Sequence, residues 1–192
     1  MPELPRVRFG TATDWEAWLA DFHADSPGVW LEIGRTGRGV HTVSYAEALD
    51  VALCFGWIDG QKRSLDDTVW LQKFTPRGPR SRWSKVNREK ANALIAAGRM
   101  RRTGLAEVER ARKDGRWEAA YDSPSTATVP PDLSAALDAD PPARAFFATL
   151  SGANRYAILY RIADAKRPQT RARRIEKYVA MLAAHETIHP QA

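Results

Sequence analysis

The chain has 192 residues, a net charge of +6 at pH 7, 44% hydrophobic residues and one cysteine, Cys54. This length fits one domain, or one domain with a smaller one appended. Seven tryptophans exclude a disordered chain, and the single cysteine excludes a disulfide scaffold. No apolar run approaches the roughly 20 residues of a membrane helix, and the first ten residues lack the apolar stretch of a secretory signal. We therefore expect no membrane insertion and a cytoplasmic location.

Two capping boxes predict helix starts in the first third of the chain, at Thr13 with Glu16 and at Ser44 with Glu47. Apolar residues at helical spacing follow the first box: Trp15, Trp18, Leu19 and Phe22. We expect Trp15, Trp18 and Phe22 to be largely buried against the sheet. A second apolar stripe follows Ser44 and ends near Gly56, a natural helix stop.

Three short strands are predicted at residues 28–35, 57–62 and 68–74 from the alternation of apolar and polar residues. The last two are joined by a short segment with turn residues, which is too short for a parallel crossover. We therefore expect an α+β fold, with a small antiparallel sheet packed with helices and followed by a C-terminal helical part.

Further helices are predicted from Ser84 to about residue 97, from Thr103 to about 114, and at residues 143–150, 151–165 and 168–184. Five prolines in residues 123–142 predict a linker or an extended wrap. The expected organisation is an α+β domain at 1–122, this Pro-rich stretch, and a helical region at 143–192 that packs on the first domain.

Three patterns resemble functional motifs but are interpreted as structural. His185-Glu-Thr-Ile-His189 matches the zinc-protease pattern, but only three residues follow it, so we expect a frayed polar tail and no metal. Gly34–Gly39 lacks the Lys-Ser or Lys-Thr of a phosphate-binding loop and is interpreted as a connection. Cys54 ends an apolar helix with no cation near it in sequence and is interpreted as a small buried hydrophobe. No cofactor is indicated.

Positive charge is concentrated in two stretches. Residues 73–102 carry ten bases against one acid, and residues 161–177 carry seven bases against two acids. Such clusters raise the local concentration of anions. Within the first stretch, residues 73–87 mix five bases with two aromatic rings and three hydroxyls and end at a predicted helix N-terminus, which also favours an anion. The alternative interpretation, weighed equally, is a solvated loop with Trp83 in the core and Ser84 as a cap.

The strand at 57–62 is the second part of the candidate site. Asp59 is expected to pair with an arginine of residues 77–82 and to hold that loop, because a lone carboxylate has no evident partner for acid–base chemistry. The predicted ligand site lies between this strand and the loop, with an aromatic ring stacking on the ligand and the cations neutralising it. Its residues are Trp57, Asp59, Lys62, Phe74, Thr75, Arg77, Arg80, Ser81, Arg82, Trp83, Ser84, Lys85 and Asn87.

Taken together, these residues resemble the bacterial YdeI/OmpD-associated family, also called bacteriocin-protection proteins. The resemblance extends from about Trp15 to Leu182 and rests on segments such as Ala52-Leu-Cys-Phe-Gly-Trp-Ile-Asp-Gly60, Phe74-Thr-Pro-Arg77, Ser81-Arg-Trp-Ser-Lys85, Gly115-Arg-Trp117 and Ala165-Lys-Arg167. It implies a role in stress protection or resistance, in a family that is largely without an assigned activity.

The leading hypothesis is a cytosolic protein that binds an anionic small molecule or peptide. The first alternative is a nucleic-acid-binding protein that uses both basic stretches as one surface. The second is an unrecognised enzyme with Asp59 as its base. Under the leading hypothesis, nucleic acid binds only as a weak, salt-sensitive background. The sequence indicates no oligomeric state.

Overall fold

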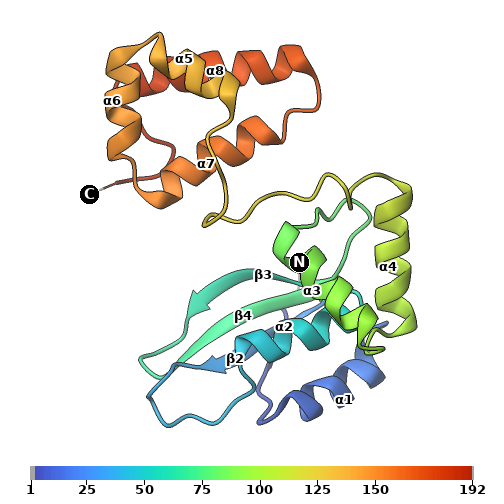
Figure 1. Cartoon of the computed structure of the whole chain (residues 1–192). Coiled ribbons are helices and arrows are strands. Elements are labelled where there is room, and N and C mark those ends of the chain that lie inside the picture. Colours follow the sequence, from blue (N-terminus) through green and yellow to red (C-terminus); the bar gives the residue numbers. More distant parts are fainter. Residues whose placement is uncertain (1–2, 192) are drawn as a thin grey trace. The chain divides into compact units, whose positions relative to one another are not determined.

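The computed structural model describes residues 3–191 of the chain. Two compact units are present, one up to Ala120 and one from Tyr121 onward (Figure 1). The first unit combines a sheet with helices, and the second is built from helices. The predicted α+β fold class is therefore confirmed.

The first unit is organised around a four-stranded sheet. Its strands are β1 (Arg6–Val7), β2 (Val29–Gly34), β3 (Trp57–Ser64) and β4 (Val69–Pro76), in the order β1-β2-β4-β3. The pairs β2–β4 and β3–β4 are antiparallel, as predicted, whereas β1 pairs with β2 in parallel. Strand β1 was not predicted, because two residues are too few to show an alternating pattern.

Helices α1 (Ala12–Phe22), α2 (Tyr45–Cys54), α3 (Lys85–Ala96) and α4 (Arg102–Lys113) complete this unit. The predicted capping boxes are confirmed at Ser44 and corrected for the first helix, where Thr11 and Asp14 form the box. Both candidate pairs in that segment have the same three-residue spacing, and the pair two residues earlier forms the cap.

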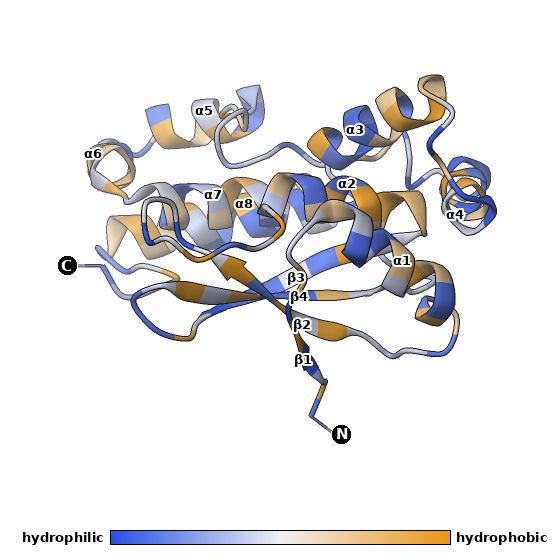
Figure 2. Cartoon of the chain, turned by 90° about the horizontal axis from the view of Figure 1, so that it is seen from below, coloured by the Kyte–Doolittle hydropathy of each residue, from blue (hydrophilic) through white to orange (hydrophobic). Residues whose placement is uncertain are grey.

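One face of the sheet packs against α1 and α2 to form the main core (Figure 2). Antiparallel register places Leu31 opposite Gln72 and Val29 opposite Phe74, so these residues share that face. Trp15 is fully buried and stacks on Trp18 with ring centroids 5.4 Å apart. The expectation for Phe22 is wrong: it is 49% exposed, at the last turn of α1.

A bulge in β3 changes which side chains face α1 and α2. Asp59 pairs with Phe74 but Lys62 pairs with Gln72, so β3 holds one residue more than β4 between these two pairs. The Gln72 side-chain amide donates to the carbonyl oxygens of Gly60 and Gln61 at 2.9 and 3.3 Å. These carbonyls thus have a hydrogen-bond donor at the point where the bulge interrupts the regular backbone pairing. Asp59 and Lys62 consequently lie on the same face of the sheet.

The second unit contains α5 (Pro131–Asp138), α6 (Pro141–Thr149), α7 (Gly152–Ala163) and α8 (Pro168–Ala183). Helix α5 lies inside the stretch expected to be a linker or wrap. Prolines suit its start, and Leu133 and Leu137, four residues apart, are buried in the core of this unit. The expected packing of the C-terminal helices on the first part of the chain stays a prediction.

The His185–His189 segment is neither a helical zinc site nor a frayed tail. Helix α8 ends at Ala183, and His185 has a φ of 58°, so the two histidines do not lie on one helical turn. Among residues 3–191, no group of three or more potential ligands is placed to hold a metal ion. The buried Asn154 side chain accepts from the His189 backbone N–H at 2.9 Å and donates to its carbonyl at 3.1 Å. The segment is therefore ordered against α7.

No helix within residues 3–191 has both the length and the apolar character needed to cross a membrane.

Candidate functional site

The three aromatic rings that were expected to stack on a ligand are part of the core. Trp57, Phe74 and Trp83 are 1%, 0% and 1% exposed. The Trp57 indole N–H donates to the carbonyl of His23 at 3.1 Å, which fixes β3 to the end of α1. In this structure these rings stabilise the first unit, and none presents a face to solvent.

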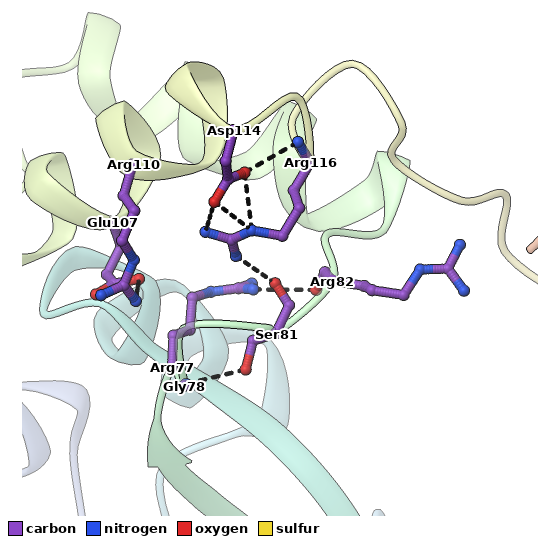
Figure 3. A network of polar contacts seen from close by, with 8 residues as sticks. All are labelled: Arg77, Gly78, Ser81, Arg82, Glu107, Arg110, Asp114 and Arg116. Carbon is purple, nitrogen blue, oxygen red and sulfur yellow. Dashed lines mark hydrogen bonds and ion pairs between the residues drawn. The ribbon is translucent and has the colours of Figure 1, made fainter. Parts of the chain in front are cut away.

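Arg77 has a structural position in the basic loop, shown in Figure 3. Its side chain is buried, with 5% exposed, and its guanidinium lies over the Trp83 ring. One guanidinium nitrogen donates to the Arg82 carbonyl at 3.2 Å, and the Gly78 backbone N–H donates to the Ser81 hydroxyl at 3.0 Å. These contacts give the loop a defined shape.

A second arginine, which the sequence analysis missed, holds the same loop from outside. Arg116 donates to the Ser81 carbonyl at 2.6 Å and is itself paired with Asp114, at 2.7 Å (Figure 3). A neighbouring ion pair joins Glu107 and Arg110 on α4. No sequence pattern linked Arg116 to Ser81, because 35 residues separate them.

The other loop residues have mixed environments. Arg80 is exposed, whereas Thr75, Arg82 and Lys85 are half-buried. Ser84 caps α3, where its hydroxyl accepts from the Asn87 backbone N–H at 3.1 Å. The interpretation of Ser84 as a cap is therefore confirmed.

Asp59 is bound by residues of α2 and α3. Its carboxylate accepts from the Tyr45 hydroxyl at 2.8 Å and from the Asn87 side-chain amide at 3.5 Å. Burial raises the pKa of Tyr45, and the adjacent Asp59 charge and hydrogen bond raise it further, so the phenol keeps its proton. The partners of Asp59 are Tyr45 and Asn87, where an arginine was expected, and its structural role stays a prediction.

A cavity of about 340 Å³ lies where β3 ends and β4 begins. It is lined by Arg35, Lys62, Arg63, Ser64 and Trp70. Ser64 pairs with Trp70, and Lys62 pairs with Gln72. Lys62, Ser64 and Trp70 therefore lie on the sheet face that carries α1 and α2. Only Lys62 was predicted. Arg35 follows the end of β2, whereas Trp70 lies in β4 and resembles an ordinary core residue in the sequence.

The cavity is cationic. Arg35 donates to the Ser64 hydroxyl at 2.8 Å and to the Asp66 carbonyl at 3.2 Å. The Arg63 guanidinium lies 4.3 Å from the ring centroid of Trp30, on the opposite face of the sheet from Lys62 and Trp70. Among the described residues that line the cavity, three are cations and none is an acid.

The carboxylate of Asp66, in the turn between β3 and β4, is held by hydrogen bonds within that turn. Asp66 accepts from the Thr68 hydroxyl, the Thr68 backbone N–H and the Val69 backbone N–H. The Thr68 contacts above all lower the pKa of Asp66, so it is ionised at neutral pH and serves as the turn cap.

The second basic stretch contributes to packing in the second unit. Arg171 on α8 binds the Asp132 carboxylate of α5 through two nitrogens, at 2.5 and 2.8 Å. Arg174 donates to the Arg161 carbonyl near the end of α7. A hollow of about 200 Å³ in this unit is lined by tyrosines together with both Asp122 and Arg171, so it carries no excess of one charge.

Two protein-family models match separate parts of the chain. Residues 7–107, more than half of the chain, match the family described as a domain of unknown function (DUF8412). The chain belongs to the DUF8412 family. Residues 126–185 of this DUF8412 protein match a second family model, described as Bacteriocin-protection, YdeI or OmpD-Associated. No curated protein and no solved structure matches the chain.

The predicted resemblance to the YdeI/OmpD-associated family is thus confirmed at residues 126–185. The central segments quoted for that resemblance, between residues 52 and 85, fall within the DUF8412 match. The cationic cavity also lies in the DUF8412 part of the chain.

Proposed function

We propose that this DUF8412 protein is a cytosolic protein that binds an anionic small molecule in the cavity lined by Arg35, Lys62, Arg63, Ser64 and Trp70. The observation that carries the proposal is the lining itself, with three cations and an indole around about 340 Å³ and no acid among the described lining residues. This volume is within the range of small-molecule sites, which combine apolar walls with a few placed polar groups.

The cavity supports the proposal better than the loop at residues 74–87. The rings of that region, Trp57, Phe74 and Trp83, are buried, and Arg77 is committed to the Trp83 ring and the Arg82 carbonyl. At the cavity, Trp70 is half-buried and Lys62 is exposed. An entering anion therefore meets both a charge and a ring without disrupting the core.

A role in stress protection or resistance is supported by the description of the family model that matches residues 126–185. The Tyr45 and Asn87 contacts to Asp59 support a structural role for this carboxylate, and binding without catalysis is the simpler function for the site.

The test is heat unfolding of the purified chain in the presence of inorganic phosphate, citrate or a tetrapeptide of glutamates. A ligand that binds only the folded state raises Tm with its concentration. We expect at least one of these anions to raise Tm for the natural chain and to lose most of that effect in Arg35→Gln. The matched control is Arg38→Gln, which removes an exposed arginine of the same loop that does not line the cavity.

Salt dependence separates this proposal from nucleic-acid binding. A chain that tracks a phosphate backbone releases condensed counterions, with a log–log slope of roughly −0.7 per contact for single strands. We expect a slope close to one contact for the small anion. Tight oligonucleotide binding with a steep slope, unaffected by Arg35→Gln, would reject the cavity proposal in favour of a basic surface.

A further inference from the structure

The two sides of the cationic cavity differ in chemistry, and this difference restricts the ligand beyond its charge. We infer that the ligand is an aromatic phosphate monoester of the size of a nucleoside monophosphate, an inference that rests on the proposed function. Its phosphate lies against Arg35 and Lys62, and its ring lies on Trp70.

The charge side of the cavity matches a dianion. A phosphate monoester carries a charge of about −1.5 to −2 at pH 7. Arg35 and Lys62 supply two positive charges beside Trp70. Arg63 also lines the cavity, but its guanidinium lies over Trp30 on the opposite face of the sheet. Arg35 donates to the Ser64 hydroxyl and the Asp66 carbonyl, and these two contacts hold its direction. The Asp66 carboxylate offsets part of the Arg35 charge, but it is held by hydrogen bonds to Thr68 and Val69.

Arg35 already donates from Nε to Asp66 and from Nη2 to Ser64, so a phosphate is bound by its remaining Nη donors. Guanidinium groups present parallel N–H donors that bind two oxygens of a phosphate at once, whereas a lysine acts as a point charge. Lys62 is exposed and lies on the same face of the sheet as Trp70, so its ammonium group can approach the remaining phosphate oxygen. A carboxylate would use these Arg35 donors equally well, but it would leave the second cation without a matching charge.

The ring side is supported from behind. The Trp70 ring packs on the Tyr45 ring, with centroids 5.9 Å apart, and the Tyr45 hydroxyl is held by Asp59 at 2.8 Å. Trp70 is therefore a fixed, half-buried platform at the cavity. A fixed indole loses little freedom when a planar ring stacks on it, and stacking of a base on an aromatic side chain strengthens binding by roughly tenfold or more.

The test measures binding by titration calorimetry at low salt, with adenosine 5′-monophosphate, ribose 5-phosphate, phenyl phosphate and adenosine as probes. For the natural chain we expect Kd for adenosine 5′-monophosphate to be about tenfold lower than Kd for ribose 5-phosphate. Phenyl phosphate should fall between the two, and adenosine should bind weakest. Phenyl phosphate binding better than adenosine 5′-monophosphate would support the aromatic phosphate but overturn the nucleoside size.

Variants assign the two halves of the ligand to the two sides of the cavity. Trp70→Leu should remove the advantage of adenosine 5′-monophosphate and leave Kd for ribose 5-phosphate unchanged, whereas Trp70→Phe should keep most of it. Arg35→Gln should weaken both phosphates by a similar factor, and Arg38→Gln should change neither. Because Trp70 also contacts Tyr45, the Phe variant and a thermal melt of each protein separate a lost platform from a lost fold.

The outcomes distinguish this inference from the proposed function. If both phosphates bind equally in the natural chain, and Arg35→Gln abolishes both, the anion site stands and the aromatic ligand is rejected. If no phosphate or other anion binds in an Arg35-dependent way, the proposed function itself fails. A preference for adenosine 5′-monophosphate that survives Trp70→Leu would also reject the inference, because the ring would then lie elsewhere.

Discussion

The guanidinium carbon of Arg77 lies 3.5 Å from the centroid of the Trp83 ring, inside the first unit. Trp83 meets Trp117 edge-on, with centroids 4.8 Å apart, and Arg112 lies 5.2 Å from the Trp117 ring. Two cations and two indoles thus join the basic loop, α4 and the segment after α4. The arrangement uses arginine as a packing group, which explains how a stretch with ten bases contains a fully enclosed cation.

Replacing Arg77 by lysine should destabilise the first unit by about 1–3 kcal/mol, because lysine loses the guanidinium contact with the Trp83 ring and the hydrogen bond to the Arg82 carbonyl. Chemical denaturation followed by tryptophan fluorescence measures the change. The matched control is Arg80→Lys at an exposed position of the same loop, with an expected change within about 0.5 kcal/mol. Equal effects of the two substitutions would contradict the packing role.

Trp15→Ala should cost about 3–5 kcal/mol of unfolding free energy, because Trp15 is fully enclosed and also donates to the Ala48 carbonyl at 3.1 Å. Phe22→Ala on the same helix removes a ring that is half-exposed and should cost less than about 1 kcal/mol. Urea midpoints for the two variants decide the matter. A Phe22 variant as unstable as the Trp15 variant would show that the outer end of α1 is covered in solution.

Cys54 should react slowly with thiol reagents in the native chain. Its side chain is buried, and burial raises the pKa of the thiol, so little thiolate is present at neutral pH. The rate of labelling should rise steeply across the urea unfolding transition. Rapid stoichiometric labelling without denaturant would mean that the end of α2 opens readily.

The ion pair between Asp132 and Arg171 should make the second unit sensitive to acid. Arg171 holds the pKa of Asp132 below its usual range, so the pair contributes stability above the unfolded pKa of aspartate, about 3.9. That contribution is lost as pH falls through the lower, folded pKa. Asp132→Asn should lower stability at pH 7 by less than about 1 kcal/mol, because the pair is partly exposed, and should flatten the decline of stability below pH 4. An unchanged acid profile would contradict this role.

Removing residues 185–192 should destabilise the second unit, because the segment occupies the hydrogen-bonding groups of the buried Asn154 and its His185 ring stacks on Phe146, 4.8 Å away. A buried amide that loses its partners costs about 1–3 kcal/mol. Glu186→Gln serves as the control at an exposed position of the segment, and neither protein should retain zinc after dialysis. A truncated chain that melts like the intact one would restore the frayed-tail interpretation.

Local patterns in the sequence predicted the parts of the fold that local physics determines. The cap at Ser44, the strand at 28–35 and the helix after Ser84 each follow from residues within a few positions of one another. The helix at 131–138 was hidden by its flanking prolines, although Leu133 and Leu137 have helical spacing. A Pro-rich composition is typical of linkers, and it is equally compatible with helices that start at proline.

The sequence predicted that the candidate site is positively charged, but not where it lies or which residues line it. A tryptophan among arginines has the same sequence pattern whether the ring faces a ligand or, like Trp83, the core. The cavity depends instead on pairing between distant segments, which brings Arg35 and Trp70 to Lys62. No spacing along the chain contains that information.

The bulge in β3 makes the cavity depend on how the strand pairs as well as on which residues it contains. If β3 continued as a regular strand after Asp59, with the same residues and no bulge, every later side chain would lie on the opposite face. Lys62 and Ser64 would then turn away from Trp70, and Arg63 would turn from Trp30 toward Trp70. The bulge therefore selects which cations of β3 face the cavity, with no difference in the composition of the strand.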